Sequence, residues 1–448
     1  MPEQGSDNTA AGIETPDDGG GSFNRIFRTL RYRNYRLFFS GQLISLIGTW
    51  MQQVAVTWLV YRLTNSAFLL GIAGFASQIP MFLLSPFAGV LADRFNRHRI
   101  IVVTQSLALI QATILAILTY TGGITIWQII ALMAFLGCIN AFDMPTRQSF
   151  VLEMVEHKED LGNAIALNSS IFNSARLIGP SIAGILIALV GEATCFLLNA
   201  ISFIAVIAAL LSMRLEKRPP TQVHHTVFQG FKEGFRYVST FRPIRDILLL
   251  LALVSIIGIP FTILMPIIAQ DVLHGGPNTF GFLMGAQGVV ALVGAITLAS
   301  RKSVRGLLKW ISSAAMVFGG GISAFALSHN QWLSMGLLML AGFGMIVQMA
   351  SSNTILQTIS DDDKRGRVIS YYTLAFAGMT PFGSLLAGSL GSAIGAPMTI
   401  LFSGFVCLAG GIIFSTHLAK LREDIRPIYQ RIGIVQRVPS DLRSVGGA

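Results

Sequence analysis

Residues 67–91 read AFLLGIAGFASQIPMFLLSPFAGVL, and residues 100–120 read IIVVTQSLALIQATILAILTY. Each run is apolar over the length of about 20 residues that a helix needs to cross the hydrocarbon core of a bilayer. Only a short polar connection separates the two runs, ADRFNRHR at residues 92–99, and its basic residues are arginines and one histidine. Two apolar spans joined by a cationic turn predict a pair of membrane-crossing helices.

The rest of the 448-residue chain has the same character. Hydrophobic residues make up 52% of it and charged residues 12%, and the mean hydropathy is +0.63. A soluble domain carries about 25% charged residues, so the composition excludes a soluble enzyme, a DNA-binding protein and a disordered scaffold. The apolar segments predict twelve spans, at about 37–60, 67–91, 100–120, 125–146, 164–190, 193–213, 246–270, 279–299, 306–327, 331–354, 368–390 and 397–418.

The distribution of positive charge orients these spans. All 32 Lys and Arg residues except Arg62 and Arg176 fall at the two ends of the chain or in alternate connections. Cytoplasmic loops carry such an excess of cations. We therefore expect a multi-pass protein of the plasma membrane, which is the inner membrane where there are two, with both termini in the cytoplasm. The lipid bilayer accounts for the net charge of +10, and nucleic acid is not an expected partner.

An internal repeat divides the chain. Segment 135–167 aligns without gaps to segment 342–374, as expected for a carrier built from two parallel repeats. The predicted fold is an all-α membrane protein with twelve transmembrane helices in two six-helix pseudo-repeats. Its expected parts are a disordered cytoplasmic tail at 1–24, an N-terminal half at 25–213, a cytoplasmic linker with an amphipathic helix at 214–245, a C-terminal half at 246–418 and a cytoplasmic tail at 419–448.

The connection after the second span carries a specific motif. Residues 89–99 read GVLADRFNRHR, which resembles the hallmark loop of the major facilitator superfamily, Gly-x-x-x-Asp-Arg-x-Gly-Arg-x-Arg. Asn96 stands where that loop has its second glycine, and asparagine tolerates a positive φ better than most residues. Together with twelve spans in two halves, the resemblance covers about residues 25–420 and implies the major facilitator fold.

The resemblance implies a gate at the cytoplasmic end of the bundle. In this family the acidic residue of the loop faces the start of span eleven, here near Val368, where the helix N-terminus favours an anion. Arg97 is then expected to meet Asp143 at the inner end of span four. The gate residues that we predict are Asp93, Arg94, Arg97 and Asp143. The alternative is that these charges only orient the loops.

Two further stretches narrow the resemblance to one branch. Residues 143–148 read DMPTRQ at the end of span four, and residues 175–180 read ARLIGP in span five. Both are similar to the branch that contains the enterobactin exporter and the macrolide-type drug efflux carriers. This implies secondary active transport by alternating access, with export of an amphipathic drug or siderophore from the cytoplasm.

Polar side chains inside the spans are the candidates for the substrate site. Arg176 lies near the middle of span five, and a charge at that depth is costly and usually functional. Ser169 and Asn173 share its helical face, and span one carries a similar stripe of polar residues spaced by three or four. The substrate-binding residues that we predict are Arg176, Asn173, Ser169, Gln42, Thr49, Gln53 and Gln348. The alternative is that these groups only hydrogen-bond to neighbouring helices, a common use of polar residues in membrane bundles.

The expected substrate carries an anionic or strongly electron-rich group beside an apolar body, because Arg176 has no acidic residue near it in sequence. A proton gradient is the expected source of energy. Met133 nevertheless stands where many proton antiporters of the superfamily have an arginine. An importer, a lysophospholipid transporter of the same fold and a non-transporting receptor remain alternatives. We expect no enzyme activity, cofactor or metal, because no nucleophile–base pair, phosphate loop or metal-ligand spacing is present in the sequence.

Overall fold

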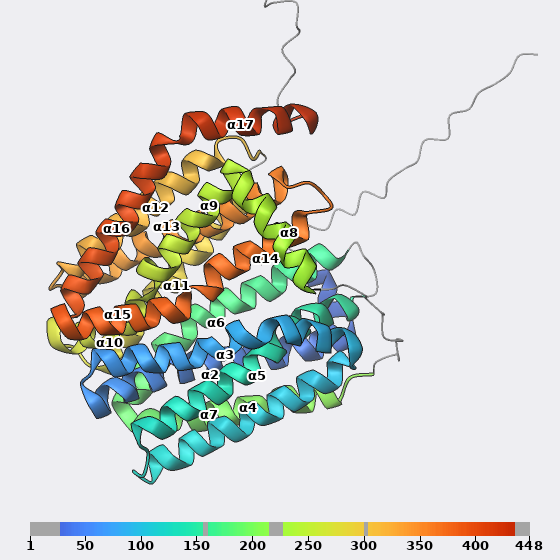
Figure 1. Ribbon diagram of the computed structural model, residues 1–448. Helices are drawn as coiled ribbons and strands as arrows, with labels where there is room; N and C mark the ends of the chain where they lie inside the picture. The colour runs from blue at the N-terminus through green and yellow to red at the C-terminus, as the bar shows by residue number, and fades with distance from the viewer. Residues whose placement is uncertain (1–26, 156–159, 215–226, 300–302, 435–448) are drawn as a thin grey trace, which may run out of the picture.

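The computed structural model describes residues 27–155, 160–214, 227–299 and 303–434. Within these ranges the chain is helical and contains no strand (Figure 1). Eleven helical passes are long and apolar enough to cross a bilayer, and α11 (Pro277–Ala299) supplies a further pass. The predicted all-α fold with twelve spans is confirmed, and most predicted edges lie within a few residues of the observed ones.

The N-terminal half consists of six continuous helices. They are α2 (Arg33–Thr64), α3 (Ala67–Arg94), α4 (Arg97–Tyr120), α5 (Ile126–Glu153), α6 (Leu161–Val190) and α7 (Glu192–Leu211). A short 3-10 helix, η1 (Phe27–Arg31), precedes them. Helix α5, which is span four, continues seven residues beyond its predicted end at 146, so Asp143 lies inside a helix and not at its end.

The C-terminal half has the same order of spans, but two of them are irregular. Span seven consists of α9 (Arg242–Leu253), η3 (Val254–Gly258), η4 (Ile259–Leu264), α10 (Met265–Ile267) and η5 (Ile268–Val272). Span eleven consists of α14 (Arg365–Thr373), η6 (Leu374–Gly378) and α15 (Thr380–Ile394). The remaining spans are α11, α12 (Leu307–Ala326), α13 (Gln331–Ile359) and α16 (Ala396–Thr416).

The irregular parts of span seven follow from its prolines. Pro260 and Pro266 have no N–H to donate to the preceding turn, and the helix adopts π and 3-10 segments around them. Such interruptions are tolerated at membrane depth where neighbouring helices or local adjustments satisfy the freed backbone groups. Span seven is therefore locally deformable at the place where it meets the N-terminal half.

The turns of the two halves reflect the internal repeat. Gly191 joins spans five and six with φ of 85°, and Gly395 joins spans eleven and twelve with φ of 83°. Residues with a side chain rarely adopt this region of φ, whereas glycine does so readily. Equivalent turns thus use the same residue in the same conformation, as expected for two copies of one six-helix unit.

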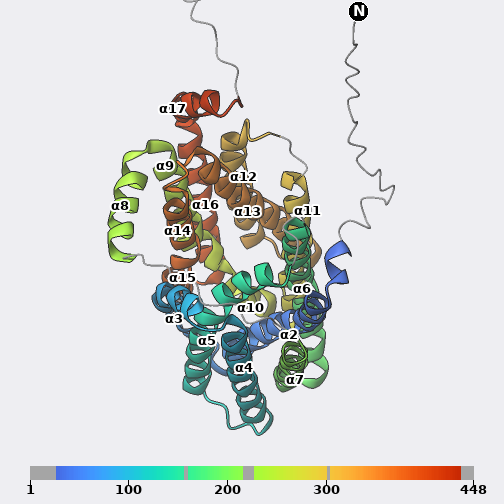
Figure 2. The ribbon, with the colours of Figure 1, turned by 90° about the vertical axis from the view of Figure 1, so that its right-hand side faces the viewer.

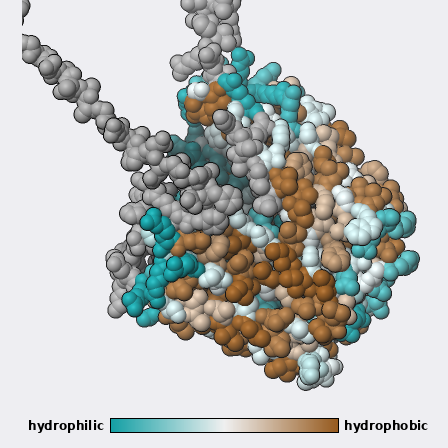
Figure 3. All heavy atoms as spheres, turned by 180° about the vertical axis from the view of Figure 1, so that it is seen from behind, coloured by the Kyte–Doolittle hydropathy of each residue, from teal (hydrophilic) through white to brown (hydrophobic). Residues whose placement is uncertain are grey.

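Figure 1 shows the N-terminal half, coloured blue to green, below the C-terminal half, coloured yellow to red. We call the end of the bundle that carries the turns at 65–66, 191 and 395 the far end. The opposite end, which holds the first and last described residues of the bundle, is the terminal end. Hydrophobic side chains cover the middle of the face seen in Figure 3, and hydrophilic ones gather at its borders. That pattern is typical of a surface that faces lipid.

Two helix pairs join the halves, and both rely on glycine. α3 lies beside α15, and α6 lies beside α11 (Figure 2). A Cβ added at Gly388 would lie 2.6 Å from Gly71 Cα, and one added at Gly281 would lie 2.7 Å from Gly184 Cα. Small residues allow membrane helices to approach this closely. All four glycines lie toward the far end, so the halves are packed most closely there.

Two amphipathic helices lie at the terminal end. α8 (Val227–Thr240) covers the stretch of the linker in which an amphipathic helix was expected, and it packs against α14, where a Cβ at Gly234 would lie 3.0 Å from the Tyr371 ring. The second, α17 (Leu418–Arg431), occupies part of the segment that we expected to be a tail. It is anchored by Leu421 and Ile425, which are both fully buried.

Candidate functional site

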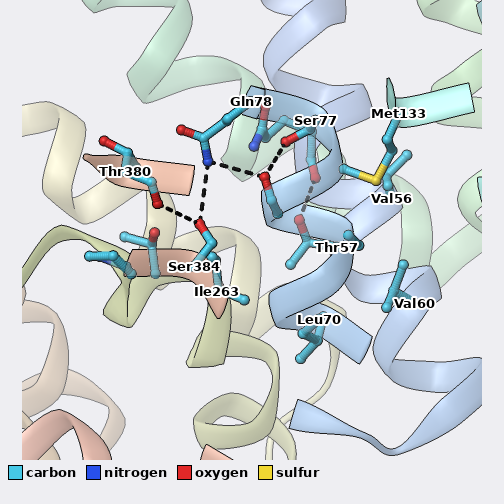
Figure 4. A pocket seen from close by; sticks show the side chains of 15 residues that line it. Val56, Thr57, Val60, Leu70, Ser77, Gln78, Met133, Ile263, Thr380 and Ser384 are labelled. Carbon is cyan, nitrogen blue, oxygen red and sulfur yellow. Dashed lines mark hydrogen bonds between the residues drawn. The ribbon is translucent and has the colours of Figure 1, made fainter. Parts of the chain in front are cut away.

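A polar cavity of about 80 Å³ lies where the two halves meet (Figure 4). Its polar side chains come from α2, α3 and the irregular spans seven and eleven; they are Gln53, Thr57, Ser77, Gln78, Thr262, Thr380 and Ser384. Leu70, Val60 and Ile263 contribute apolar wall. A space of this size with several polar partners can hold water. Because both halves line it, any motion of one half against the other changes its shape.

Gln78 is the side chain that crosses the junction in Figure 4. Its Nε2 donates to Ser384 Oγ of the other half at 3.5 Å and to the carbonyl of Gly74 at 3.4 Å. Ser384 itself donates to the Thr380 carbonyl at 3.0 Å. Bonds of 3.4–3.5 Å are at the weak limit for an N–H donor. This polar contact therefore contributes little to holding the halves together.

The polar stripe predicted on span one is divided by the structure. Gln42 and Ser45 are buried, with exposed fractions of 1% and 3%, whereas Thr49 and Gln53 are exposed. Gln53 reaches the cavity, and Thr57, one turn further along, continues the stripe into it. The same spacing of four residues thus extends beyond the part of the stripe that we predicted.

Arg176 lies at the middle of α6 and is half-buried. Its guanidinium is 5.9 Å from the centre of the Trp50 ring of α2, a cation–π distance. The Phe172 ring packs edge-on against the same tryptophan, with 5.9 Å between ring centres. Among the described residues no carboxylate pairs with Arg176, and no hydrogen bond of its guanidinium is found there. The cation–π contact with the Trp50 ring is thus the interaction of the Arg176 guanidinium that the structure describes.

The direction of Arg176 follows from the two faces of α6. Ser169 and Asn173 lie on its own face, as predicted, and Asn173 Nδ2 donates to the Ser169 carbonyl at 2.8 Å. The exposed apolar residues Ile178 and Ile185 lie on the opposite face. Apolar exposure is expected toward lipid. The face of Arg176 is therefore the one that points between α2 and α11, toward the junction of the halves.

Asp143 is the centre of a buried polar network near the terminal end. It is 1% exposed and accepts from Thr104 Oγ1 at 2.7 Å and from Gln105 Nε2 at 2.9 Å. Arg147, one turn along α5, pairs with its other oxygen. Arg147 Nη1 also donates to Gln42 Oε1 at 2.6 Å. The predicted site residue Gln42 thus belongs to a network with the predicted gate residue Asp143.

Of the other predicted gate residues, only Arg97 has a described side chain, and it is not a partner of Asp143. Arg97 takes part in an interaction of its own. The physical reason is that Arg147 is already one helical turn away, on the same face as Asp143. The side chains of Asp93 and Arg94, at the end of α3, lie outside the described residues.

Gln348 is placed away from the cavity. It is fully buried in α13, and neither polar atom of its amide has a hydrogen-bond partner among the described residues. A buried network of amide side chains, centred on Gln52, was not predicted. Gln52 donates to Gln111 at 3.0 Å and accepts from Asn199 at 2.8 Å, and so links α2, α4 and α7. The sequence signal was an amide residue within the apolar run of each of these three spans.

The far end is closed by contacts between the halves. Tyr61 of α2 donates to Asp271 of span seven at 2.6 Å. The Trp58 and Phe280 rings stack with centres 6.0 Å apart. Among the described residues, the hydrogen bonds that join α2–α7 to the spans of the C-terminal half are this one and that of Gln78. The terminal end has no such bond in the described part of the chain.

At the terminal end the amphipathic helices are tied to the loop before α14. Asp361 accepts from Arg431 of α17 at 3.3 Å and from the Tyr237 hydroxyl of α8 at 3.2 Å. The bond from Arg431 is the main cause that holds the pKa of Asp361 below its usual value. Burial, together with the charge of Asp361, raises the pKa of Tyr237. Both shifts stabilise the arrangement in which the tyrosine donates and the carboxylate is ionised.

Two six-helix halves of one pattern, with a polar cavity at their junction, are the architecture of a membrane transporter. Among the described residues no group of His, Cys, Asp and Glu side chains is arranged to hold a metal ion.

Comparison with known families places the chain more narrowly. Residues 25–429 match the family model described as transmembrane secretion effector. The protein therefore belongs to that family of the major facilitator superfamily, in its drug and siderophore efflux branch.

The chain is similar to proteins of known activity over most of its length. It is 28% identical to the staphyloferrin A transporter of Staphylococcus aureus over 86% of this chain and 97% of that protein. It is 26% identical to the multidrug efflux pump Tap of Mycobacterium tuberculosis over 86% of this chain and 93% of that one. Among solved structures, a bacterial homologue of the human lysosomal transporter Spinster, in an inward-facing and unoccupied conformation, has a TM-score of 0.66. It has 14% identity and covers 89% of this chain and 98% of its own, which supports the fold.

Proposed function

We propose that this protein exports amphipathic small molecules, a drug or a siderophore, from the cytoplasm by secondary active transport. The observation that carries the proposal is Arg176, which points toward the junction of the halves with no carboxylate partner in the described part of the chain. The polar cavity around Gln53 and Gln78, which in the described conformation has room for water, lies at the same junction and would have to widen to admit the rest of an amphipathic molecule. The efflux pumps among its relatives agree with this direction.

The substrate that suits this site carries an anionic or strongly electron-rich group beside an apolar body. Placing an arginine at the bilayer centre costs at least ~2.5–3.5 kcal/mol on insertion scales, and an anionic ligand offsets part of this cost. A guanidinium stays charged and can hold a carboxylate or catecholate by two parallel hydrogen bonds. Trp50 keeps the guanidinium in place without neutralising its charge.

The distribution of positive residues in the sequence supports a cytoplasmic position for the terminal end. With that orientation the contacts of the far end close the outer side, and we infer that the described conformation faces the cytoplasm. A substrate then enters from the cytoplasm and lies beside Arg176. Closing of the terminal end and opening of the far end release it outside.

A proton gradient is the proposed source of energy, and Asp143 is the proposed coupling carboxylate. It is buried among helices, and its charge holds Arg147 and, through it, Gln42. Loss of the carboxylate charge removes that attraction and frees the terminal ends of α2 and α5 to move. In the outward-facing state we expect Arg97 to replace Arg147 as the partner of Asp143. A charge swap between Arg97 and Asp143 should then recover more transport than either single change.

The test is transport and binding with Arg176→Lys and Arg176→Gln in everted membrane vesicles, with and without a protonophore. Arg176→Lys keeps the charge but loses the fork, so it should weaken binding of an anionic amphipathic dye. Arg176→Gln should weaken that binding at least about tenfold, which is about 1.4 kcal/mol. Both should leave a cationic dye bound as well as before or better. Lys309→Gln, which removes an exposed charge of α12, is the control.

Three results would overturn the proposal. Folded Arg176→Gln that binds both dyes as the parent does removes the anion site. Loss of folded protein in both Arg176 variants, whatever dye is added, assigns the arginine to helix packing. Accumulation of dye in right-side-out vesicles but not in everted ones would make the protein an importer.

A further inference from the structure

A second, larger space lies on the outside of the N-terminal half. It is a groove of about 480 Å³ between α4 and α5, near the terminal end. Its lining includes Phe95, Arg99, Val103, Leu107, Cys138 and Phe142. Phe95 and Val103 expose 60% and 56% of their surfaces, so the groove opens toward the lipid and is separate from the cavity at the junction.

The groove has one charged end and is otherwise apolar. Arg99 stands at its mouth in the first turn of α4, where Asn96 caps the helix by accepting from the Arg99 N–H at 3.1 Å. The Arg99 side chain is exposed and has no carboxylate partner among the described residues. The N-terminus of α4 adds its own partial positive charge at the same place. An apolar channel with a cation at the level of the head groups complements one acyl chain and one phosphate.

The inner wall of the groove touches the network of Asp143. Thr104 lines the groove and also donates to Asp143 Oδ1 at 2.7 Å. A chain seated in the groove therefore packs against the residue that holds the buried carboxylate in place. Occupation of the groove should stabilise the terminal ends of α4 and α5 in the described arrangement.

We propose that an anionic phospholipid occupies this groove, with its phosphate at Arg99 and one acyl chain along Val103, Leu107 and Cys138. Charge complementarity selects the head group, because a zwitterionic phosphatidylcholine places a second, positive group beside Arg99. The leaflet at the terminal end supplies the lipid. The proposal concerns a site distinct from the Arg176 site and does not depend on the exported substrate.

The test is native mass spectrometry of the purified full-length protein in equal amounts of phosphatidylglycerol and phosphatidylcholine of the same chain length. The parent should retain one phosphatidylglycerol in preference to phosphatidylcholine, and Arg99→Gln should lower that retention at least about threefold. Cys138→Phe, which places a ring in the groove, should lower it as well. Lys309→Gln, an equal loss of charge at an exposed position of α12, should leave it unchanged. Inorganic phosphate added together with the lipids should not displace the retained phosphatidylglycerol.

A second measurement covers variants that fold poorly. Phosphatidylglycerol should raise the melting temperature of the parent and of Lys309→Gln, but not that of Arg99→Gln. Equal retention of the two lipids by the parent would overturn the proposal. So would an unchanged preference in Arg99→Gln. A loss in Arg99→Gln without any loss in Cys138→Phe would place the head group but remove the acyl chain from the groove, and that result also contradicts the proposal.

Discussion

The two ends of the bundle hold the halves in different ways. At the far end the halves touch directly, through the glycine pairs of α3 with α15 and of α6 with α11 and through the bond from Tyr61 to Asp271. At the terminal end the buried charges are satisfied within one half, as in the pair of Asp143 and Arg147. The far end is therefore closed by shape, whereas the terminal end is organised by charge. A cycle between two states needs both kinds of contact to be reversible.

The largest effect is expected where a buried charge loses its partner. Asp143→Asn leaves the half-buried Arg147 guanidinium without a carboxylate. Breaking a buried ion pair costs roughly 3–5 kcal/mol, and partial exposure of Arg147 places this case near the lower limit. We expect a marked fall in the melting temperature of the purified protein and loss of proton-driven transport.

The double variant Asp143→Asn with Arg147→Gln separates stability from coupling. It removes the unpaired charge, so stability should recover while proton-driven transport stays lost. Asp424→Asn, an exposed carboxylate of α17, should change neither property. A single Asp143→Asn variant that is as stable as the parent would show that the pair does not hold the terminal end.

The next effect concerns closure by shape. Gly388→Val places side-chain atoms against Gly71, where even a Cβ is within 2.6 Å of backbone. Over-packing costs about 1–3 kcal/mol, so the closed far end should become about 5-fold to 150-fold less populated. A cysteine at Thr57, in a Cys138→Ala background, should then react faster with an impermeant thiol reagent added from the far side.

The matched control for this variant is Gly320→Val on α12, where a Cβ meets nothing within 4 Å. It should leave the reaction rate and transport unchanged. Equal rates in Gly388→Val and in the parent would mean that the glycine pair does not close the far end.

Features that depend on one span alone could be predicted from sequence, whereas contacts between distant spans could not. Apolar length located the spans because a membrane helix depends on its own residues. Arg176 and Gln53 were predicted for the same reason, since a polar side chain in an apolar span is visible without its neighbours. Gln78 and Ser384 were not predicted, because their importance arises only where two distant spans meet.

The partners of charged groups were harder to predict than their positions. Asp143 was expected to meet Arg97, and its described partner is Arg147 in the same helix. Spacing of four residues would have allowed that pair, but the predicted end of the span at 146 separated the two residues. Helix α17 was not predicted because most of its residues are charged or polar. Its buried positions, Leu421 and Ile425, are four residues apart on one face and form only a short apolar pattern.

A smaller effect is expected from the polar contact of the far end. Tyr61→Phe removes the bond to Asp271 but keeps the ring. A hydrogen bond to a charged group contributes about 1.5 kcal/mol or more when buried, and the exposed Asp271 recovers part of this from water. We expect the closed far end to lose about three- to tenfold in population, measured by the same cysteine reaction. Tyr120→Phe, an exposed tyrosine at the same end, should have no effect.

The smallest effect is expected at the terminal end, where Arg431 of α17 holds Asp361. The folded pKa of Asp361 lies below its usual value, and this bond is the main cause. A group with a lowered folded pKa stabilises the folded arrangement above its unfolded pKa, and the contribution is lost as the pH falls through the folded pKa.

Arg431→Gln should therefore speed hydrogen exchange of the amides of α17 at about pH 6 by a factor of less than about five, since an exposed ion pair contributes roughly 0–1 kcal/mol. After correction for the intrinsic rate, the difference from the parent should shrink below about pH 4, where the carboxyl becomes protonated. Arg426→Gln, on the same helix without an ion pair in the described part of the chain, should exchange like the parent at both values. A difference between Arg431→Gln and the parent that stays constant down to about pH 3 would mean that Arg431 acts through packing and not through the charge of Asp361.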